Sequence, residues 1–182
     1  YLDTRLGESL FSSLDIKRVR NAYGYQWGLA MKLSDLFTGD NIEIDFPRAD
    51  KDAFLESIIK DLDARGYILD RDRVVGDIIE RENVMSTGIG NGVAIPHAYT
   101  DGVDRLVAGF YRTSGGVDFD ALDKNSVDLF FIILGPKESR RDHIKVLAKI
   151  SRLLNHDDFR EDLRKATDVD AVMHVFKRFG DK

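Results

Sequence analysis

The 182-residue sequence lacks cysteine, long apolar runs and an excess of positive charge. The absence of cysteine excludes disulfides, thiolate metal sites and cysteine nucleophiles together. No apolar run reaches the roughly 18 residues that a membrane span needs, and the chain does not open with a signal-peptide pattern. We therefore expect a cytoplasmic protein without direct membrane insertion. Because Tyr1 is not an initiator methionine, we also allow for a piece of a longer polypeptide.

The charge balance is acidic, with a formal net charge of −5 and a pI near 5.4. Binding of nucleic acid by general electrostatics requires a concentrated basic face. The only basic cluster is the short KRVR at Lys17–Arg20, which we interpret as a solvated helix face. The composition therefore predicts no nucleic-acid partner.

The length and the hydrophobic content of 43% suit one domain with additional residues at one end. A domain of this size buries about 70% of the surface of its unfolded chain. Leu6, Leu10 and Leu14 are spaced four apart, which predicts helix within residues 1–30. We interpret this segment as a helical extension or a linker, and its apolar residues could dock on the main domain or form a homo-oligomer. Residues 31–180 are the predicted domain.

From Met31 the pattern changes to alternating strands and helices. Period-two apolar residues predict a strand over Asn41–Phe46. Asp50 is expected to cap a helix that ends at Gly66. A second helix is expected to follow directly, with Asp70 as its cap. The predicted core-facing positions of the two helices are Phe54, Leu55, Ile58, Ile59, Leu62, Val74, Val75, Ile78 and Ile79.

Three further strands are predicted at Gly92–Ile95, Leu106–Arg112 and Val127–Leu134. The last of them, VDLFFIIL, is apolar enough to be central and covered on both faces. Turns are expected at Gly115–Gly116 and at the segment DALDKNS, residues 120–126.

Two more helices complete the pattern. One is predicted to begin with a capping box formed by Ser139 and Asp142, and the segment TDVD at Thr167–Asp170 is expected to repeat this device for a C-terminal helix. The order of elements predicts an α/β layer structure, with one mostly buried sheet and helices packed against it.

The segment TGIGNGVAIPHA, Thr87–Ala98, is the richest in signals. Glycine loops often hold the phosphates of nucleotides, but this loop lacks the Gly-Lys-Ser/Thr ending of a P-loop. The residues that follow it also resemble a strand, whereas nucleotide loops open a helix. We therefore exclude a nucleotide site.

His97 is the candidate functional residue of this segment. Gly88, Gly90 and Gly92 permit backbone conformations that other residues cannot adopt and let a partner come close. Pro96 restricts its own φ, so His97 is expected to leave the end of a strand in a defined direction. Such an imidazole suits a nucleophile or a phosphoryl acceptor, although a histidine that merely caps a loop would give the same spacing.

The chain resembles the EIIA domain of the mannitol/fructose class (type 2) of the bacterial phosphoenolpyruvate-dependent sugar phosphotransferase system, including its nitrogen-regulatory branch. The resemblance covers Met31 to Phe179, in order and in spacing. The segments that carry it are REN (81–83), STGIGNGVAIPHA (86–98), DGVDRLV (101–107), VDFDALD (117–123), VDLFFIILGPKES (127–139) and HIKVLAKISRLL (143–154).

This resemblance implies a central mixed β-sheet flanked by helices on both faces, to which the N-terminal helical extension is added. It implies that His97 is phosphorylated, on Nε2, by a histidine phosphocarrier protein (HPr or its nitrogen-branch equivalent). His143 would lie beside the acceptor and Arg81 would help to hold the phosphoryl group. The acceptor would then pass the group to an EIIB partner, or its phosphorylation state would control binding to other proteins. The scheme requires no metal and no cofactor.

The residues themselves support part of this scheme. His143 falls in the first turn of a predicted helix, where the dipole favours a neutral imidazole. Arg81 could donate two hydrogen bonds to a phosphoryl group, or form an exposed pair with a neighbouring glutamate, Glu80 or Glu82. Ser86 and Thr87 could donate to phosphoryl oxygens, but ordinary turn residues explain them nearly as well.

Other readings remain at this point. A hydrolase could use Ser86 or Ser114 with His97 and Asp101, but the chain has no G-x-S-x-G nucleophile elbow. His156 lies on a predicted helical surface without a motif, as does His174, and neither is expected to take part in the chemistry. The choice between sugar transport and regulation stays open.

Overall fold

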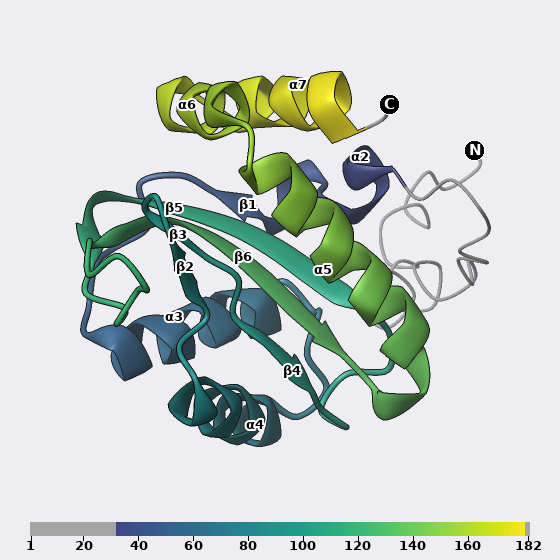
Figure 1. Ribbon diagram of the computed structural model, residues 1–182. Helices are drawn as coiled ribbons and strands as arrows, with labels where there is room; N and C mark the ends of the chain where they lie inside the picture. The colour runs from purple at the N-terminus through teal and green to yellow at the C-terminus, as the bar shows by residue number, and fades with distance from the viewer. Residues whose placement is uncertain (1–31, 181–182) are drawn as a thin grey trace, which may run out of the picture. The chain divides into compact units, whose positions relative to one another are not determined.

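The computed structural model describes residues 32–180, and Figure 1 shows their arrangement. The predicted helical extension, residues 1–30, lies outside the described residues, so the domain boundary stays a prediction. The elements are α2 (Leu33–Leu36), the 3-10 turn η1 (Gly39–Asn41), β1 (Ile42–Glu43), α3 (Lys51–Ala64), α4 (Arg71–Val84), β2 (Gly88–Gly90), β3 (Val93–Ala94), β4 (His97–Tyr99), β5 (Val107–Val117), β6 (Val127–Gly135), the 3-10 turn η2 (Lys137–Ser139), α5 (Arg140–Leu154), α6 (Asp157–Lys165) and α7 (Val169–Gly180).

The sheet is mixed and is built around β6. Its order is β1-β5-β6-β3-β2, and β4 also pairs with β6. β5 lies antiparallel to one edge of β6, while β3 and β4 lie parallel to its other edge. The segment VDLFFIIL therefore forms the central strand, as the sequence predicts, because both of its faces are apolar and buried.

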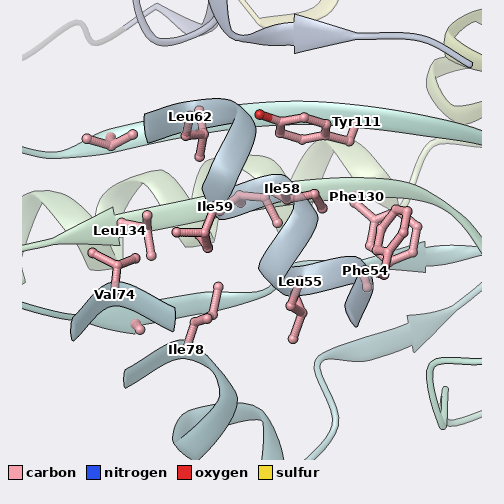
Figure 2. Packing of buried hydrophobic residues seen from close by; sticks show 14 of the residues in the cluster. Phe54, Leu55, Ile58, Ile59, Leu62, Val74, Ile78, Tyr111, Phe130 and Leu134 are labelled. Carbon is pink, nitrogen blue, oxygen red and sulfur yellow. The ribbon is translucent and has the colours of Figure 1, made fainter. Parts of the chain in front are cut away.

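Helices cover both faces of this sheet (Figure 1). α3 and α4 pack on one face, where Phe130 and Leu134 of β6 meet the apolar side of α3 (Figure 2). On the other face Phe131 of β6 contacts Phe176 of α7, with ring centroids 6.3 Å apart. Alternate residues of β6 thus enter two separate cores, which is the expected consequence of the period-two pleat.

The two helices after β1 begin and end where the sequence predicts. The carboxylate of Asp50 accepts the backbone N–H of Ala53, and that of Asp70 accepts the N–H of Arg73. The first helix stops at Gly66, whose φ is 78°. The predicted core-facing positions are buried, except that Val75 and Ile79 are only partly buried against the same core.

Two strand predictions need correction. The strand expected over Asn41–Phe46 contains only Ile42 and Glu43, because Asp45 takes a left-handed backbone conformation with φ 61°. The turn expected at Gly115–Gly116 is instead part of β5, which runs on to Val117. Both glycines have positive φ and form an irregular bulge in the pairing with β6, so the strand bends without ending.

The capping predictions for the later helices are wrong in detail. Ser139 makes no side-chain cap, because it lies in the η2 turn and its hydroxyl donates to the carbonyl of Pro136 (2.8 Å). At α7 the capping carboxylate belongs to Asp168, which accepts the N–H of Ala171 (2.8 Å), and not to the Thr167 hydroxyl. The short helix α6 was not predicted. Within residues 32–180 no helix is long and apolar enough to cross a membrane.

Candidate functional site

His97 begins strand β4, and two residues, Ile95 and Pro96, separate it from the end of β3. β3 and β4 follow the same edge of β6, and Pro96 interrupts them because it has no N–H to donate. Its carbonyl still accepts the N–H of Ile133 (3.0 Å), which keeps the interrupted segment against β6. The sequence places His97 at the end of a strand, whereas in the structure it starts the next one, paired in register with Ile133.

The two ring nitrogens of His97 have different partners. Nδ1 lies 2.8 Å from the carbonyl oxygen of Ile95, which can only accept, so Nδ1 carries the proton. Nε2 lies 3.3 Å from Nη2 of Arg81, which can only donate, so Nε2 carries the lone pair. The contacts therefore select one neutral tautomer, with the nucleophilic nitrogen facing the guanidinium.

Arg81 reaches this nitrogen from the last turn of α4. Its Nη1 donates to the carbonyl of Met85 (3.0 Å), so the guanidinium is held at two points. The alternative of an exposed ion pair with Glu82 is wrong, because Glu82 is buried and pairs with Lys51 (3.1 Å). The guanidinium of Arg81 thus lies beside Nε2 and is not paired with a carboxylate of α4.

His143 of α5 also lies near His97. The two ring centroids are 6.0 Å apart, and the ring of Tyr99 lies 4.5 Å from that of His143. His143 is fully buried, and neither ring nitrogen has a hydrogen-bond partner among the described residues. In its neutral form this ring has one N–H, which has no acceptor among the described residues.

Burial controls the charge of both histidines. It lowers the pKa of His143 to about 4, with a smaller contribution from the charge of His97. Burial also lowers the pKa of His97, and Arg81 acts in the same direction, against the Ile95 carbonyl and the negative charge of Glu82. Both rings are neutral near pH 7. The sequence predicts a neutral His143 from the dipole of its helix, and in the structure burial is the largest cause of its lowered pKa.

Ser86 and Thr87 use their hydroxyl protons elsewhere. Ser86 Oγ donates to the carbonyl of Phe119 (2.7 Å), and Thr87 Oγ1 donates to Oε2 of Glu82 (2.6 Å). The backbone N–H of Thr87 also donates to Glu82 (2.9 Å). Their contact with a phosphoryl group stays a prediction, which would require these hydroxyls to turn from their present partners.

The glycine-rich loop is packed against the protein itself. Gly90 and Gly92 have positive φ, as expected of their residue type. A Cβ at Gly92 would lie 2.5 Å from both Nη2 of Arg164 and Oδ1 of Asp128. At this position the close approach that glycine permits is to an internal ion pair, because Arg164 joins Asp128 and the carbonyl of Asn91.

Comparison with known families decides the assignment. Residues 35–179 match the family model described as phosphoenolpyruvate-dependent sugar phosphotransferase system, EIIA 2. The chain belongs to this family. It is therefore an EIIA phosphoryl carrier of a phosphotransferase system, as the resemblance of its motifs indicates.

Relatives of this EIIA domain fall in both branches of the family. The fructose-specific EIIA component of Haloferax volcanii is 37% identical over 134 residues, which cover 74% of this chain and 87% of that protein. A nitrogen regulatory protein of Pseudomonas aeruginosa is 30% identical over 145 residues, covering 80% and 94%. The crystal structure of the nitrogen regulatory protein IIA-Ntr from Neisseria meningitidis superposes with a TM-score of 0.74 at 30% identity, covering 79% of this chain and 98% of that one.

Sequence reasoning missed Glu82, Lys51 and Tyr99 as neighbours of the EIIA site. A signal for Glu82 was present, because it follows Val74 and Ile78 at a spacing of four and so continues the buried stripe of α4. No comparable signal marked Lys51 or Tyr99, whose proximity to the site depends on the packing of α3 and on the pairing of β4.

The remaining candidates do not join the site. The hydroxyl of Ser114 donates to Asp45 (3.3 Å), and Asp101 lies 3.7 Å from Arg73, so no Ser-His-Asp arrangement forms at His97. His156 and His174 are exposed. Among the described residues no group of three histidines or carboxylates is arranged to hold a metal ion.

Proposed function

We propose that this EIIA domain accepts a phosphoryl group on Nε2 of His97 from a histidine phosphocarrier protein and passes it to an EIIB partner. The selected tautomer carries this proposal. Because Nδ1–H is held by the Ile95 carbonyl, the lone pair of Nε2 is available without a prior proton transfer. In the transfer, the P–N bond to the carrier's histidine breaks as the bond to Nε2 forms, and the carrier's nitrogen leaves with its electron pair.

Arg81 and His143 would stabilise the group during this transfer. Phosphoryl transfer is catalysed mainly by positioning and by compensation of the charge on the phosphoryl oxygens. Arg81 supplies a cation 3.3 Å from the acceptor nitrogen, and His143 supplies a neutral donor whose ring centroid lies 6.0 Å from that of His97. A neutral His143 binds the phosphoryl group without placing a second positive charge beside His97 before the transfer.

The surroundings of the site suit docking of a protein donor. Met85 and Ile144 are exposed, by 67% and 55%, although they are apolar. Met85 provides the carbonyl that holds Arg81, and Ile144 follows His143 in the chain. A partner that covers them would exclude water from the phosphoryl group, which favours transfer over hydrolysis.

A regulatory role is the second candidate. The similarity to nitrogen regulatory proteins of Pseudomonas aeruginosa and Neisseria meningitidis favours it. In that case the phosphorylated and unphosphorylated forms would bind a target protein differently, and no sugar would receive the group. His97 would accept the phosphoryl group in the same way in both roles.

Incubation with radiolabelled phosphoenolpyruvate, the general phosphotransfer enzyme and the phosphocarrier tests the proposal. We expect acid-labile label on His97 and none in His97→Ala, with His174→Ala as the matched control that retains it. Label in His97→Ala equal to that of the wild type would refute the acceptor assignment. Addition of fructose- and mannitol-class EIIB domains then separates the two roles, because a transport component loses its label to EIIB whereas a regulatory module keeps it.

A further inference from the structure

Glu82 is a buried carboxylate that the acceptor chemistry does not use directly. It lies in the last turn of α4, one residue after Arg81, and is only 2% exposed. Lys51 at the start of α3 balances its charge, with Nζ 3.1 Å from Oε1 of Glu82. A buried ion pair is seldom a net gain in stability over apolar packing, so its position one residue from a functional arginine needs a reason.

One set of contacts connects Glu82 to the ring of His97. The carboxylate accepts both the backbone N–H (2.9 Å) and the hydroxyl (2.6 Å) of Thr87. The carbonyl of Thr87 accepts the N–H of Ile95 (3.1 Å), and the carbonyl of Ile95 accepts Nδ1–H of His97 (2.8 Å). The orientation of the imidazole therefore depends on the carbonyl of Ile95. Ile95 is held in place by Thr87, and Thr87 is held by Glu82.

A second set of contacts connects Glu82 to the guanidinium. Met85 lies between Glu82 and Thr87 in the chain, inside the loop that their two hydrogen bonds close. The carbonyl of Met85 accepts Nη1–H of Arg81 (3.0 Å). The two hydrogen bonds between Glu82 and Thr87 limit the conformations of this loop. They therefore also limit where the Met85 carbonyl can hold Arg81.

We infer that Glu82, paired with Lys51, is a positioning residue that aligns both groups at the acceptor nitrogen. It acts on His97 through Thr87 and Ile95, and on Arg81 through the loop at Met85. This inference rests on the proposed role of His97 as acceptor. A carboxylate is required because it accepts two hydrogen bonds and an ammonium group at once, whereas an amide at this place would turn a donor towards Lys51 or Thr87.

The decisive variant is Glu82→Gln, examined first without any phosphoryl donor. Nitrogen-15 NMR of the imidazole should show Nδ1–H in the wild type and a mixture of tautomers in Glu82→Gln. The matched control is Asp61→Asn, which removes a carboxylate that accepts the Tyr111 hydroxyl (2.8 Å) and pairs with Arg65 (2.8 Å), remote from His97. This control should keep the wild-type tautomer, since its contacts do not lead to the site.

Phosphorylation by the phosphocarrier is the second measurement. We expect the maximal rate per folded molecule to fall up to about 100-fold in Glu82→Gln, with the KM for the phosphocarrier unchanged, because misalignment acts on the transfer step. Asp61→Asn should retain the wild-type rate per folded molecule. A wild-type tautomer and rate in folded Glu82→Gln would overturn the inference.

Thr87→Val is the variant to use if Glu82→Gln does not fold. It removes only the hydrogen bond from the Thr87 hydroxyl to Glu82 and keeps the one from the backbone N–H. We expect a smaller change of the same kind, again with mixed tautomers in the unphosphorylated protein. If the Thr87 hydroxyl only contacted the phosphoryl group, its removal would leave the tautomer of His97 unchanged. That result would contradict the inference that Glu82 positions His97 through Thr87. Failure of the wild type to become labelled would instead refute the proposed function, because the tautomer is measured without the donor.

Discussion

His97 and His143 show how the surroundings assign different tasks to the same residue type. His97 is half-buried, and both of its nitrogens have partners that select its tautomer. His143 is fully buried, and its ring nitrogens have no partner within residues 32–180. Burial lowers the pKa of both residues, that of His143 to about 4. In the proposed transfer the first would attack and the second would donate.

The buried His143 predicts acid sensitivity of the folded state. Its pKa is about 4 when folded and 6.5 ordinarily, so between these values the unfolded chain binds a proton that the folded protein does not. Its contribution to stability is complete above pH 6.5 and is lost as the pH falls through that window to about 4. One pKa unit is worth about 1.4 kcal/mol, so the loss should reach about 3 kcal/mol.

Urea unfolding of the wild type and of His143→Leu between pH 7 and pH 4 measures this contribution. The free energy of unfolding should fall less steeply in His143→Leu, because leucine takes no proton. His174→Leu, which replaces an exposed histidine, should follow the wild type. Parallel pH profiles of wild type and His143→Leu would show that His143 is not held neutral by the fold.

At the scale of single elements, helix starts follow the carboxylates. Asp50 and Asp70 cap α3 and α4 as predicted. At α7 the sequence offers Thr167 and Asp168 side by side, and the carboxylate is the group that reaches the free N–H of Ala171. At α5 the residue before the helix, Ser139, is itself in a 3-10 turn and its hydroxyl is directed to Pro136. The residue type alone therefore does not identify the cap.

Replacement of the two neighbours before α7 tests this assignment. Asp168→Ala should lower the free energy of unfolding by about 1 kcal/mol, because an N–H at the helix start loses its acceptor. Thr167→Ala should change it by much less, since this hydroxyl only contacts the Asp168 side chain. Chemical unfolding of both variants at pH 7 measures the difference, and an equal or larger loss in Thr167→Ala would contradict the assignment.

At the scale of the whole described domain, β6 joins two cores that differ in composition. The α3 and α4 side is mainly aliphatic (Figure 2), whereas the other side contains a cluster of phenylalanine rings. Phe176 of α7 is central to that cluster, with ring centroids 4.8 Å from Phe37 and 5.6 Å from Phe110. It also contacts Phe131 and Phe159 and so connects the C-cap of α2 with β5, β6 and α6.

Phe176→Ala should therefore destabilise the domain strongly without altering the site. Loss of a fully buried phenylalanine typically costs about 3–5 kcal/mol. The rings that Phe176 contacts belong to Phe37, Phe110, Phe131 and Phe159, none of which is in the acceptor site. The phosphorylation rate per folded molecule should therefore match the wild type at a temperature where the variant is folded. Urea unfolding and initial phosphorylation rates measure the two quantities. A large drop in rate with little loss of stability would mean that the aromatic core shapes the site.

The sequence by itself determined the α/β class, the central strand VDLFFIIL, helices α3 and α4 with their caps, and the motifs that point to His97, Arg81 and His143. These features depend on short-range patterns, such as apolar period and capping within one turn, or on motifs whose order and spacing identify the family.

Only the tertiary structure decided the tautomer of His97, the cause of the neutral state of His143 and the pairing of Glu82 with Lys51. Each depends on groups that are brought together by packing, such as Lys51 of α3 against α4, or the burial of α5 on β6. It also turned the glycine pair at 115–116 from a turn into a bulge, because the strand can continue its pairing with β6 beyond it. Local patterns contain no information on such distant partners, and these partners set the hydrogen bonds and pKa values on which the chemistry depends.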